Sequence, residues 1–277
     1  MSAAGLKKLC ELVFDKHWDV WRVRLSPGDH ADVPPLEIEL IDPDVPSTKN
    51  PYSRRYTPEE RKFWKKLIPE LVASGVIRPS DGKKGLAPSN LVKKKKPGDY
   101  RMIGDFRRRN KNTRTVRYLI PRLDDIVQEL LGSKVFASAD MLKGYWQMLV
   151  AEESRGYFAF LTPFGIYEYC RVTMGACNSG PHFQRCMQEI LRELLYSGLL
   201  QYLDDSLLYD KDENELLARL DRYFTLLRQH GIKLHPSKMD FYATELTWAG
   251  KRISADGVKV APERLSLIHI SEPTRPY

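Results

Sequence analysis

One segment limits the possible folds of this 277-residue sequence more than any other. Residues 199–209 form an apolar stretch that is interrupted by two adjacent aspartates, Asp204 and Asp205. The pattern predicts a β-hairpin with the two carboxylates at its tip. A third aspartate, Asp140, ends an apolar strand predicted over residues 135–140. Neighbouring strands of one sheet would bring all three acidic side chains to one point.

Two predicted helices flank this hairpin along the chain. The first starts at Pro181 and ends at Gly198, and the second follows the N-cap Asp212 and ends at Gly231. Apolar residues recur along one side of each helix. The order strand, helix, hairpin, helix, strand is typical of a split β-α-β arrangement. We therefore predict an α+β fold in which an antiparallel sheet is backed by helices.

The first part of the chain contains a further helix and a less regular segment. Thr57 is placed to act as an N-cap, with Pro58 in the first helical position and Glu60 completing a capping box, and the helix is expected to end at Gly75. We expect its apolar face to serve core packing alone. Residues 1–50 combine a short helical pattern with a stretch rich in proline and aspartate, which predicts an N-terminal extension and linker.

Three more strands are predicted between the basic part of the chain and the helix at Pro181. Alternating apolar residues place them at residues 147–150, 157–161 and 167–172. Residues 162–165, Thr-Pro-Phe-Gly, are typical of a turn that joins the last two strands.

Positive charge is concentrated in one part of the chain. The formal net charge is +8, whereas residues 93–117 contain eleven Lys and Arg against Asp99 and Asp105, a local balance of +9. The remaining sequence is therefore nearly neutral. A concentrated basic segment suits a polyphosphate partner, because each neutralised phosphate releases counterions. A solvated loop or a localisation signal would have a similar composition.

Several classes of protein are disfavoured by the sequence. No apolar run approaches the roughly 18 residues of a membrane span, and the N-terminus is charged where a signal peptide would be apolar. We therefore expect a cytoplasmic or nuclear chain with no membrane partner. The four cysteines lack a CxxC pair or zinc-site spacing, which predicts reduced thiols. The six histidines include no HExxH motif, so carboxylates must bind any metal.

The three aspartates suit the chemistry of nucleotide polymerisation. A primer 3′-hydroxyl attacks an α-phosphate, and negative charge develops on the entering and leaving oxygens. Two divalent cations roughly 3.5–4 Å apart stabilise both oxygens, and Mg²⁺ prefers carboxylate ligands. A single aspartate at a strand end is often only a turn residue or a helix cap. Asp140 together with Asp204 and Asp205, which Tyr202 and Leu203 precede, is a much stronger indication.

Several segments resemble reverse transcriptases and follow one another in that family's order. YLDD at 202–205 resembles the catalytic hairpin, and ASADMLKGYWQM at 137–148 resembles the strand with the other catalytic aspartate. Four further segments of this chain resemble sequence blocks of the same family. They are LVKKKKPGDYRMIGDFRRRN at 91–110, MGACNSGPHFQ at 174–184, GIKLHPSK at 231–238 and LTWAGKRIS at 246–254. Together they cover about residues 50–264 and are most similar to polymerases of gypsy-type long-terminal-repeat retrotransposons.

The resemblance implies roles for the matching residues. Two Mg²⁺ ions, or Mn²⁺ as a substitute, would be bound by the three aspartates. The expected partners are an RNA or DNA template with its primer and deoxynucleoside triphosphates (dNTPs). The implied site residues are Asp140, Asp204 and Asp205 for catalysis and metal binding, Lys95, Arg101, Tyr145 and Met174 for nucleotide binding, and Gln184, Lys238, Trp248 and Gly250 for template-primer binding.

Some of these roles have plain structural alternatives. Tyr145 matches the aromatic residue that crowds the sugar 2′ position and rejects ribonucleotides, but it would also serve as a buried aromatic side chain. Trp248 suits simple core burial as well as contact with the primer. Asp105 would support the nucleotide pocket or form a surface salt bridge. Where relatives commonly have Pro-Phe-Gly, this chain has Thr-Met-Gly at 173–175, so Met174 is expected to line the nucleotide pocket differently.

The resemblance also implies the fingers and palm of a right-hand polymerase. We expect the polymerase domain at residues 51–264, after an N-terminal extension and linker, and a missing thumb after it. The fingers would comprise residues 51–114 and 148–178, and the palm residues 115–147 and 179–264. Residues 265–277 include LSLIHISEPTR, which resembles the translation of a sequencing adapter, so we expect a non-native tail there. An ordinary polar terminus is the alternative.

Two other functions are compatible with part of the pattern. An RNA-dependent RNA polymerase also needs paired aspartates on a palm sheet, but the aromatic Tyr145 argues against an enzyme that must admit a 2′-hydroxyl. A catalytically silent remnant of a retroelement would bind nucleic acid through the basic fingers alone. The three intact aspartates argue against that function.

Overall fold

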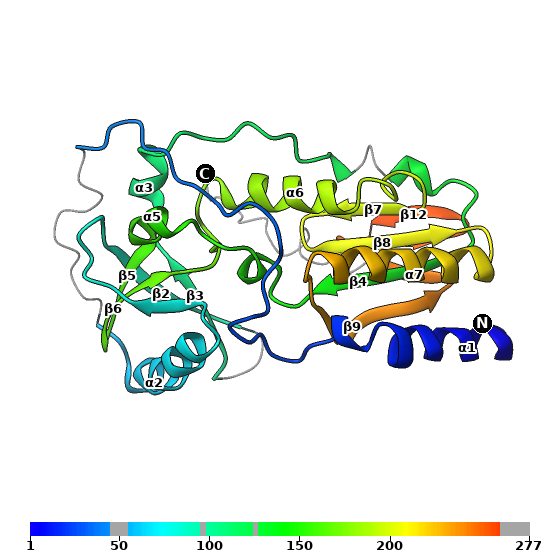
Figure 1. Cartoon of the computed structure of the whole chain (residues 1–277), viewed down its shortest axis with the longest axis horizontal. Coiled ribbons are helices and arrows are strands. Elements are labelled where there is room, and N and C mark those ends of the chain that lie inside the picture. Colours follow the sequence, from blue (N-terminus) through cyan, green and yellow to red (C-terminus); the bar gives the residue numbers. More distant parts are fainter. Residues whose placement is uncertain (45–54, 95–97, 124–126, 261–277) are drawn as a thin grey trace, which may run out of the picture.

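The computed structural model describes residues 1–44, 55–94, 98–123 and 127–260, which form two lobes (Figure 1). A five-stranded sheet forms the centre of the fingers lobe, with strand order β1-β6-β5-β2-β3. The palm lobe contains a four-stranded sheet, β7-β8-β4-β9, and a three-stranded sheet, β10-β11-β12. Two helices pack on the four-stranded sheet. The predicted α+β fold, an antiparallel palm sheet backed by helices, is confirmed.

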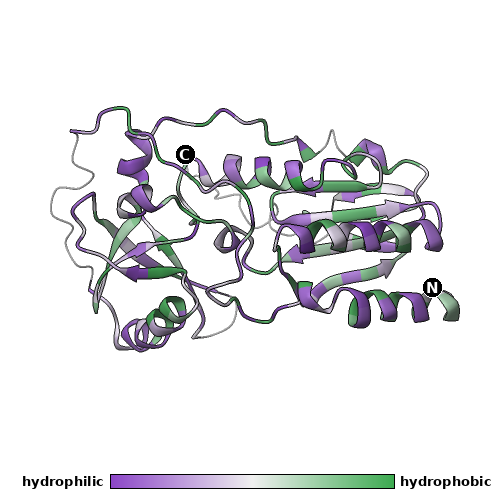
Figure 2. Cartoon of the chain, in the orientation of Figure 1, coloured by the Kyte–Doolittle hydropathy of each residue, from purple (hydrophilic) through white to green (hydrophobic). Residues whose placement is uncertain are grey.

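The palm sheet is antiparallel throughout. Its strands are β4 (Val135–Met141), β7 (Leu199–Tyr202), β8 (Asp205–Asp210) and β9 (Leu234–Ala243). One face is covered by α6 (Ser179–Ile190) and α7 (Glu213–Gln229). In Figure 2 the sheet strands contain apolar stretches, whereas much of α7 is hydrophilic. The helices therefore turn their apolar sides toward the sheet.

Successive side chains of β4 point to opposite faces of the palm sheet, and each face packs against a different apolar core. Ala137, Ala139 and Met141 face the main core under α6 and α7. Phe136 faces a second core, which the three-stranded sheet completes. Because side chains alternate along a strand, Asp140 points to the same face as Phe136. The helices therefore cover the face of the sheet opposite to the acidic side chain.

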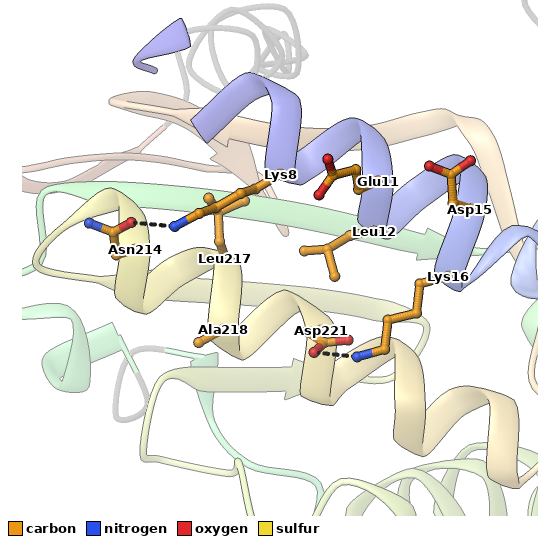
Figure 3. A pocket seen from close by; sticks show the side chains of 9 residues that line it. All are labelled: Lys8, Glu11, Leu12, Asp15, Lys16, Asn214, Leu217, Ala218 and Asp221. Carbon is orange, nitrogen blue, oxygen red and sulfur yellow. Dashed lines mark hydrogen bonds and ion pairs between the residues drawn. The ribbon is translucent and has the colours of Figure 1, made fainter. Parts of the chain in front are cut away.

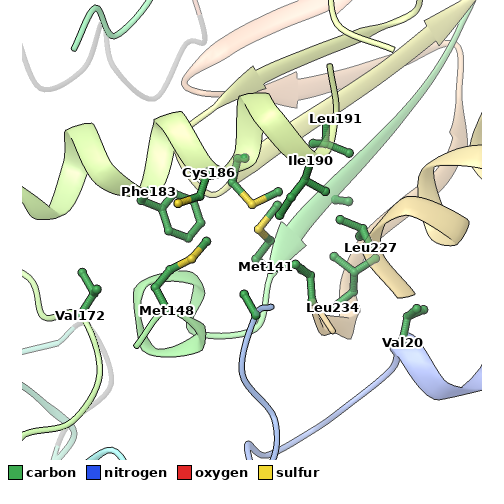
Figure 4. Packing of buried hydrophobic residues seen from close by; sticks show 14 of the residues in the cluster. Val20, Met141, Met148, Val172, Phe183, Cys186, Ile190, Leu191, Leu227 and Leu234 are labelled. Atoms are coloured by element: carbon green, nitrogen blue, oxygen red, sulfur yellow. The ribbon is translucent and has the colours of Figure 1, made fainter. Parts of the chain in front are cut away.

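The main core fixes the sheet against its helices. In Figure 4 the side chains of Met141, Ile190, Leu227 and Leu234 come from β4, α6, α7 and β9 and lie in one apolar cluster. None of the four is more than 5% exposed. Full burial of such a side chain stabilises the fold by about 1.5–3 kcal/mol. The strand ends that hold the aspartates are thus mounted on a closely packed support.

Helix α7 begins and ends where the sequence predicts. The Asp212 side chain accepts hydrogen bonds from the backbone N–H groups of Asn214 (2.8 Å) and Glu215 (3.0 Å). The helix ends before Gly231, whose φ of +69° is in the left-handed region that favours glycine.

Helix α6 differs from its prediction, because it begins at Ser179 and ends at Ile190 rather than continuing to Gly198. Tyr196 and Gly198 have positive φ and turn the chain back into β7. Leu191 and Leu194 are nevertheless buried in the turns after the helix. Their spacing continues the helical pattern, and this explains why the pattern overestimates the length of the helix.

The fingers sheet consists of short strands, of which only β2 and β5 pair in parallel. In spatial order they are β1 (Ile77–Pro79), β6 (Gly165–Tyr169), β5 (Ala159–Thr162), β2 (Ala87–Lys93) and β3 (Tyr100–Gly104). The predicted turn at residues 162–165 joins β5 to β6. Two short helices, α3 (Arg107–Lys111) and α5 (Glu152–Arg155), also belong to this lobe.

Helix α2 (Pro58–Ala73) starts with the predicted capping box. Glu60 N–H donates to Thr57 Oγ1 (3.2 Å), and Thr57 N–H donates to Glu60 Oε2 (2.9 Å). Its Trp64 side chain is fully buried, which agrees with the expected role in core packing.

The predicted strand at residues 147–150 is wrong. A 3₁₀ turn (Gly144–Gln147) occupies its start, and Leu149 and Val150 form only isolated bridges. The buried Gln147 side chain holds this turn in place. Its Nε2 donates to the carbonyl oxygens of Leu142 and Lys233, and its Oε1 accepts from Lys233 N–H. This amide thus ties the 3₁₀ turn to Leu142 and to Lys233, the residue before β9.

The N-terminal segment contacts both lobes. It starts with α1 (Ala3–Cys10), a π-helical turn (Glu11–Lys16) and a 3₁₀ turn (Trp18–Val20). Isolated bridges then join Trp21 to Leu234 in the palm and Leu40 to Thr113 in the fingers. The predicted linker includes residues 45–50, which lie outside the described residues, as does the predicted tail at 265–277. Within the described ranges, no helix combines the length and the apolar character that a bilayer crossing requires.

The three-stranded sheet packs on the face of the palm sheet that α6 and α7 leave uncovered. Its strands are β10 (Glu245–Trp248), β11 (Lys251–Ser254) and β12 (Gly257–Val260). Ala249 and Gly250 form the two-residue turn between β10 and β11, and both have positive φ. This geometry is that of a tight hairpin.

We predict that Gly231→Ala destabilises the chain strongly. A Cβ atom there would lie 2.7 Å from the backbone oxygen of His30, in addition to the strain of a positive φ. The free energy of unfolding should fall by about 2–4 kcal/mol. Gly132 is the matched control, because its φ is +82° but no atom lies within 4 Å of an added Cβ. Gly132→Ala should lower the free energy of unfolding, measured by chemical denaturation, by only about 1 kcal/mol. Equal losses of unfolding free energy in the two variants would contradict this explanation.

Candidate active site

The two adjacent aspartates lie at a tight hairpin turn. Tyr202 pairs with Asp205, so Leu203 and Asp204 alone form the turn between β7 and β8. Leu203 has a φ of +52°, a conformation that costs an L-residue about 1–2 kcal/mol. Such strain persists only where the surroundings hold the backbone in place.

Two buried glutamines supply that support. Gln184 on α6 accepts a hydrogen bond from Leu203 N–H (2.7 Å) and donates to Gln201 O (3.2 Å). The side chain of Gln201 donates to Leu203 O and accepts from Ser206 Oγ. Gln201 was missed by the sequence analysis, because nothing in a strand residue's local pattern shows that its amide reaches the next turn.

The third aspartate lies directly across the sheet. Asp140 is the cross-strand partner of Asp205 in the antiparallel pairing of β4 with β8. Directly opposed like charges destabilise a sheet. Asp204 adjoins the pair, since its backbone oxygen accepts a hydrogen bond from Met141 N–H at 3.3 Å. The structure thus brings the three predicted aspartates to one place.

The acidic groups have shifted proton affinities. Burial raises the pKa of Asp205 to about 6, with further contributions from the charges of Asp204 and Asp140. Burial also raises the pKa of Asp204, and Asp140 adds to that shift. Lys238 opposes both shifts, and its Nζ lies 2.6 Å from Asp140 Oδ2. One ammonium group therefore offsets only part of the repulsion among three carboxylates.

This donor set fits a hard divalent cation. Carboxylate oxygens are the ligands that Mg²⁺ prefers. Burial raises the pKa of Asp205, the charges of Asp204 and Asp140 raise it further, and a bound cation would neutralise those charges. Among the described residues, no three acidic, histidine or cysteine side chains converge tightly enough to enclose an ion on their own. Mg²⁺ in phosphoryl-transfer sites commonly takes only one or two carboxylates, with water and substrate phosphates as its other ligands. The open arrangement of the three aspartates suits that mode.

A polar cleft of about 280 Å³ adjoins the aspartates. It lies among β4, β8, β9 and the β10–β11 hairpin, and Asp140, Asp205 and Lys238 contribute to its wall. Trp248 also lines it, but this side chain is only 3% exposed and packs in the second core. Gly250, in the turn after Trp248, has a φ of +78°. The hairpin that resembles the primer-gripping block therefore borders the acidic site.

The residues predicted to bind the nucleotide approach from the fingers and from the turn after β4. Arg101 lies on the exposed side of β3, between the buried Tyr100 and Met102. Tyr145 is half-buried, and its ring centroid lies 5.1 Å from that of Phe183. Met174 is exposed in the loop before α6. Lys95 lies outside the described residues.

Two further candidate residues make contacts within the protein. Gln184 is fully buried against the hairpin, although it was predicted to contact the template-primer. Asp105 forms an ion pair with the exposed Arg107, whose hydrogen bond lowers the pKa of the carboxyl group. The surface salt bridge, one of the two alternatives for Asp105, is therefore what the structure contains.

A larger cleft of about 680 Å³ lies between the N-terminal helical segment and α7 (Figure 3). Its wall includes the ion pair between Lys16 and Asp221, at 2.7 Å. Leu12, Leu217 and Ala218 form its apolar part. It shares no residue with the predicted catalytic site.

Comparison with known proteins identifies the family. The family model for reverse transcriptase (RNA-dependent DNA polymerase) matches residues 92–253, more than half of the chain. The Pol polyprotein from transposon 297 of Drosophila melanogaster is 35% identical over 73% of this chain, and that from transposon gypsy is 29% identical over 73%. The enzymatic polyprotein of cauliflower mosaic virus (strain Strasbourg) is 32% identical over 90% of the chain. This chain belongs to the reverse transcriptase family, and its similarity to gypsy-type elements is confirmed.

Solved structures give the same fold. The foamy viral protease-reverse transcriptase in complex with an RNA/DNA hybrid superposes with a TM-score of 0.84 at 22% identity, over 99% of this chain and 36% of that chain. Its complex with dsDNA gives 0.85 at 21% identity, over 100% and 56%. At this identity the likeness shows the right-hand polymerase fold. The chain spans 19%, 20% and 36% of the transposon 297, gypsy and cauliflower mosaic virus polyproteins.

We predict that the acidic site makes stability depend on pH. The pKa of Asp205 is about 6 in the folded chain against 3.8 for an unperturbed group. Between these two pH values Asp205 is protonated more in the folded chain than in the unfolded chain, so the stability of the fold decreases as the pH rises. The full loss of stability is present above about pH 6, where Asp205 is ionised in both states. With metal removed by chelation, Asp205→Asn should therefore raise the free energy of unfolding by about 1–2 kcal/mol at about pH 7.5.

The same substitution should have little effect at about pH 4, where the aspartate is protonated in the folded chain. Urea denaturation of both proteins at the two pH values measures the difference. Asp256→Asn, at an exposed turn, is the control and should change stability at neither pH. An Asp205→Asn variant that is less stable than the parent at neutral pH would contradict the predicted cost of charging Asp205 in the folded chain.

Proposed function

We propose that this chain catalyses template-directed DNA synthesis on RNA and DNA templates. The reaction is nucleotidyl transfer from a dNTP to a primer 3′-hydroxyl. The observation that carries the proposal is the register of β4 and β8, which sets Asp140 opposite Asp205 with Asp204 in the adjoining turn. Family membership supports the same activity, and the foamy viral neighbour with this fold has been solved with nucleic acid.

Asp140, Asp204 and Asp205 would hold two Mg²⁺ ions, which supply charge neutralisation to the attacking and leaving oxygens when bound. Mn²⁺ would substitute for them. The repulsion of Asp205 by Asp204 and Asp140, which adds to the effect of burial on its pKa, favours such binding. Lys238, already paired with Asp140, keeps a cation beside the acidic group when the ions are absent. The protein groups thus prepare the site electrostatically before the substrate arrives.

The remaining residues position the substrates. Arg101 projects from the exposed side of β3 and would bind phosphates of the dNTP. Lys95, in the adjoining segment, would act with it. Tyr145, packed on Phe183, would close the space around the sugar 2′ position, and Met174 would contribute an apolar contact. The hairpin of Trp248 and Gly250 would support the primer, and Gln184 would act indirectly by holding the Leu203 turn.

The setting follows from the relatives. The matched curated relatives are polyproteins, so we propose that the chain works as part of a retrotransposon polyprotein. All four cysteines are free thiols, which suits a reducing compartment. We therefore assign its work to the cytosol or nucleus.

We predict that Asp140→Asn and Asp204→Asn each abolish primer extension while leaving template-primer binding intact. The amide keeps the side-chain volume but removes a charged metal ligand, and the extension rate should fall by about 1000-fold or more. Single-nucleotide extension of a DNA primer on an RNA template, with Mg²⁺, measures the rate. Fluorescence anisotropy measures the binding.

Asp256→Asn is again the control, because it removes a carboxylate at an exposed turn without approaching the site. It should extend primers like the parent chain. Near-parental extension by either active-site variant would remove the metal-binding assignment. A parent chain that binds template-primer but never extends it would instead support a silent nucleic-acid-binding function.

We predict a separate effect for Tyr145→Ala. The half-buried Tyr145 ring packs on Phe183. Burial raises the pKa of its phenol, and the charge of the nearby Asp204 raises it further. Removal of the ring opens space beside the sugar, so ribonucleotide incorporation should rise by about 10-fold or more relative to deoxyribonucleotide incorporation. Competition between the two substrates on one template gives the ratio. An unchanged ratio would assign Tyr145 to core packing alone.

A further inference from the structure

We propose that Lys143 is a further binding group for the triphosphate of the incoming nucleotide. This inference rests on the proposed polymerase function and adds one residue to its nucleotide site. The sequence analysis did not single out Lys143, which lies between Asp140 and Tyr145 in the segment that resembles the first catalytic strand. Its backbone conformation, its position and its neighbouring charges carry the proposal.

The backbone of Lys143 is held in an unusual conformation. Its φ is +52°, in the left-handed region, which costs a lysine about 1–2 kcal/mol. It precedes the 3₁₀ turn of residues Gly144–Gln147, and its carbonyl oxygen accepts a hydrogen bond from Trp146 N–H at 2.7 Å. Residues kept in strained conformations are concentrated at functional sites, so this conformation needs an explanation.

The turn is packed against the acidic site. A Cβ atom added to Gly144 would lie 3.1 Å from Asp204 Cβ and 3.1 Å from Phe183 Cζ. The backbone after Lys143 therefore approaches Asp204 as closely as a glycine allows. This contact fixes the origin of the lysine side chain beside a predicted metal ligand.

The charges of three other cationic side chains act on the Lys143 ammonium group. Although the residue is exposed, nearby protein atoms lower its ammonium pKa, and the charges of Lys94, Lys238 and Arg101 lower it further. Asp99 acts in the opposite direction. The Nζ atom lies 5.5 Å from the centroid of the Trp146 ring, which supports a cation on its face.

The available carboxylates do not neutralise this group. Lys94 is paired with Asp99 at 2.9 Å, and Lys238 with Asp140 at 2.6 Å. Within the part of the chain that the structure describes, neither Arg101 nor Lys143 has a carboxylate within 4.0 Å. Like charges held together without counterions are unfavourable, and a multiply charged anion relieves their repulsion. The geometry therefore favours a polyphosphate ligand between the two lobes.

The position of Lys143 favours the triphosphate over the template backbone. For the α-phosphate to reach the aspartates, the rest of the triphosphate must lie beside them. Lys143 follows Asp140 by three residues, and its turn touches Asp204. Arg101 lies on β3, a strand at the inner side of the fingers lobe (Figure 1), and its charge acts on Lys143. The two unpaired cations would thus bind the triphosphate from opposite sides.

The test is steady-state single-nucleotide incorporation by Lys143→Met. The KM for dNTP should rise by about 10-fold, with kcat within about 3-fold, since the lost contact is made to the bound substrate. The Kd for template-primer should stay within about 2-fold of the parent value. Lys134→Met is the matched control, because Lys134 is exposed at the opposite end of the same strand. Lys143→Arg should retain most of the affinity for dNTP.

A second variant and a second probe keep the proposal falsifiable. Lys143→Asn removes the charge with a residue that tolerates left-handed φ, so it separates a charge effect from a folding defect. Calorimetry with inorganic tripolyphosphate measures anion binding without catalysis. Binding should weaken by about 10-fold in Lys143→Met and Lys143→Asn but not in Lys134→Met.

Two results would overturn the proposal. If dNTP KM and tripolyphosphate affinity are unchanged, Lys143 is a surface lysine. If only the template-primer Kd rises, Lys143 contacts nucleic acid instead. A parent chain that extends no primer would defeat the proposed function, whereas the tripolyphosphate measurement would still test Lys143 by itself.

Discussion

The acidic site depends on one unfavourable pairing, in which Asp140 on β4 lies opposite Asp205 on β8. Burial and mutual repulsion raise the pKa of Asp205. In the absence of bound cations, the ionised Asp205 carboxylate therefore lowers the stability of the folded chain. The opposite face of the same strands offsets this cost. There Ala137, Ala139 and Met141 pack under α6 and α7. Apolar burial on one face thus holds the acidic groups together on the other.

Backbone strain is found around the same site. Leu203, Lys143 and Ala249 all have positive φ, and they lie at the hairpin tip, after β4 and at the end of β10. Each conformation costs about 1–2 kcal/mol in isolation. The contacts that maintain them come from elsewhere in the fold, such as the amide of Gln184 at the Leu203 turn. The site is therefore positioned by its supports before any substrate binds.

The sequence predicted best what local chemistry decides. The capping box of Thr57 and Glu60, the N-cap Asp212 and the hairpin of Asp204 and Asp205 depend on residues a few positions apart. Tertiary contacts decided the rest. The Gln147 amide bonds to backbone groups of Leu142 and Lys233, and the Gln184 side chain is buried against the Leu203 turn. Neither arrangement can be deduced from neighbouring residues, because each depends on a carbonyl or N–H group supplied by a distant segment.

We propose that Asp140 on β4, Asp205 on β8 and Asp204 in the adjoining turn form one site for two divalent ions. Manganese stoichiometry tests it most directly, by electron paramagnetic resonance of free Mn²⁺ titrated into the chain with template-primer and a non-hydrolysable dNTP analogue. We predict about two tightly bound ions per chain in this complex, and a loss of tight binding when Asp140 or Asp204 is replaced by asparagine. Equal binding by the parent and both variants would contradict the account.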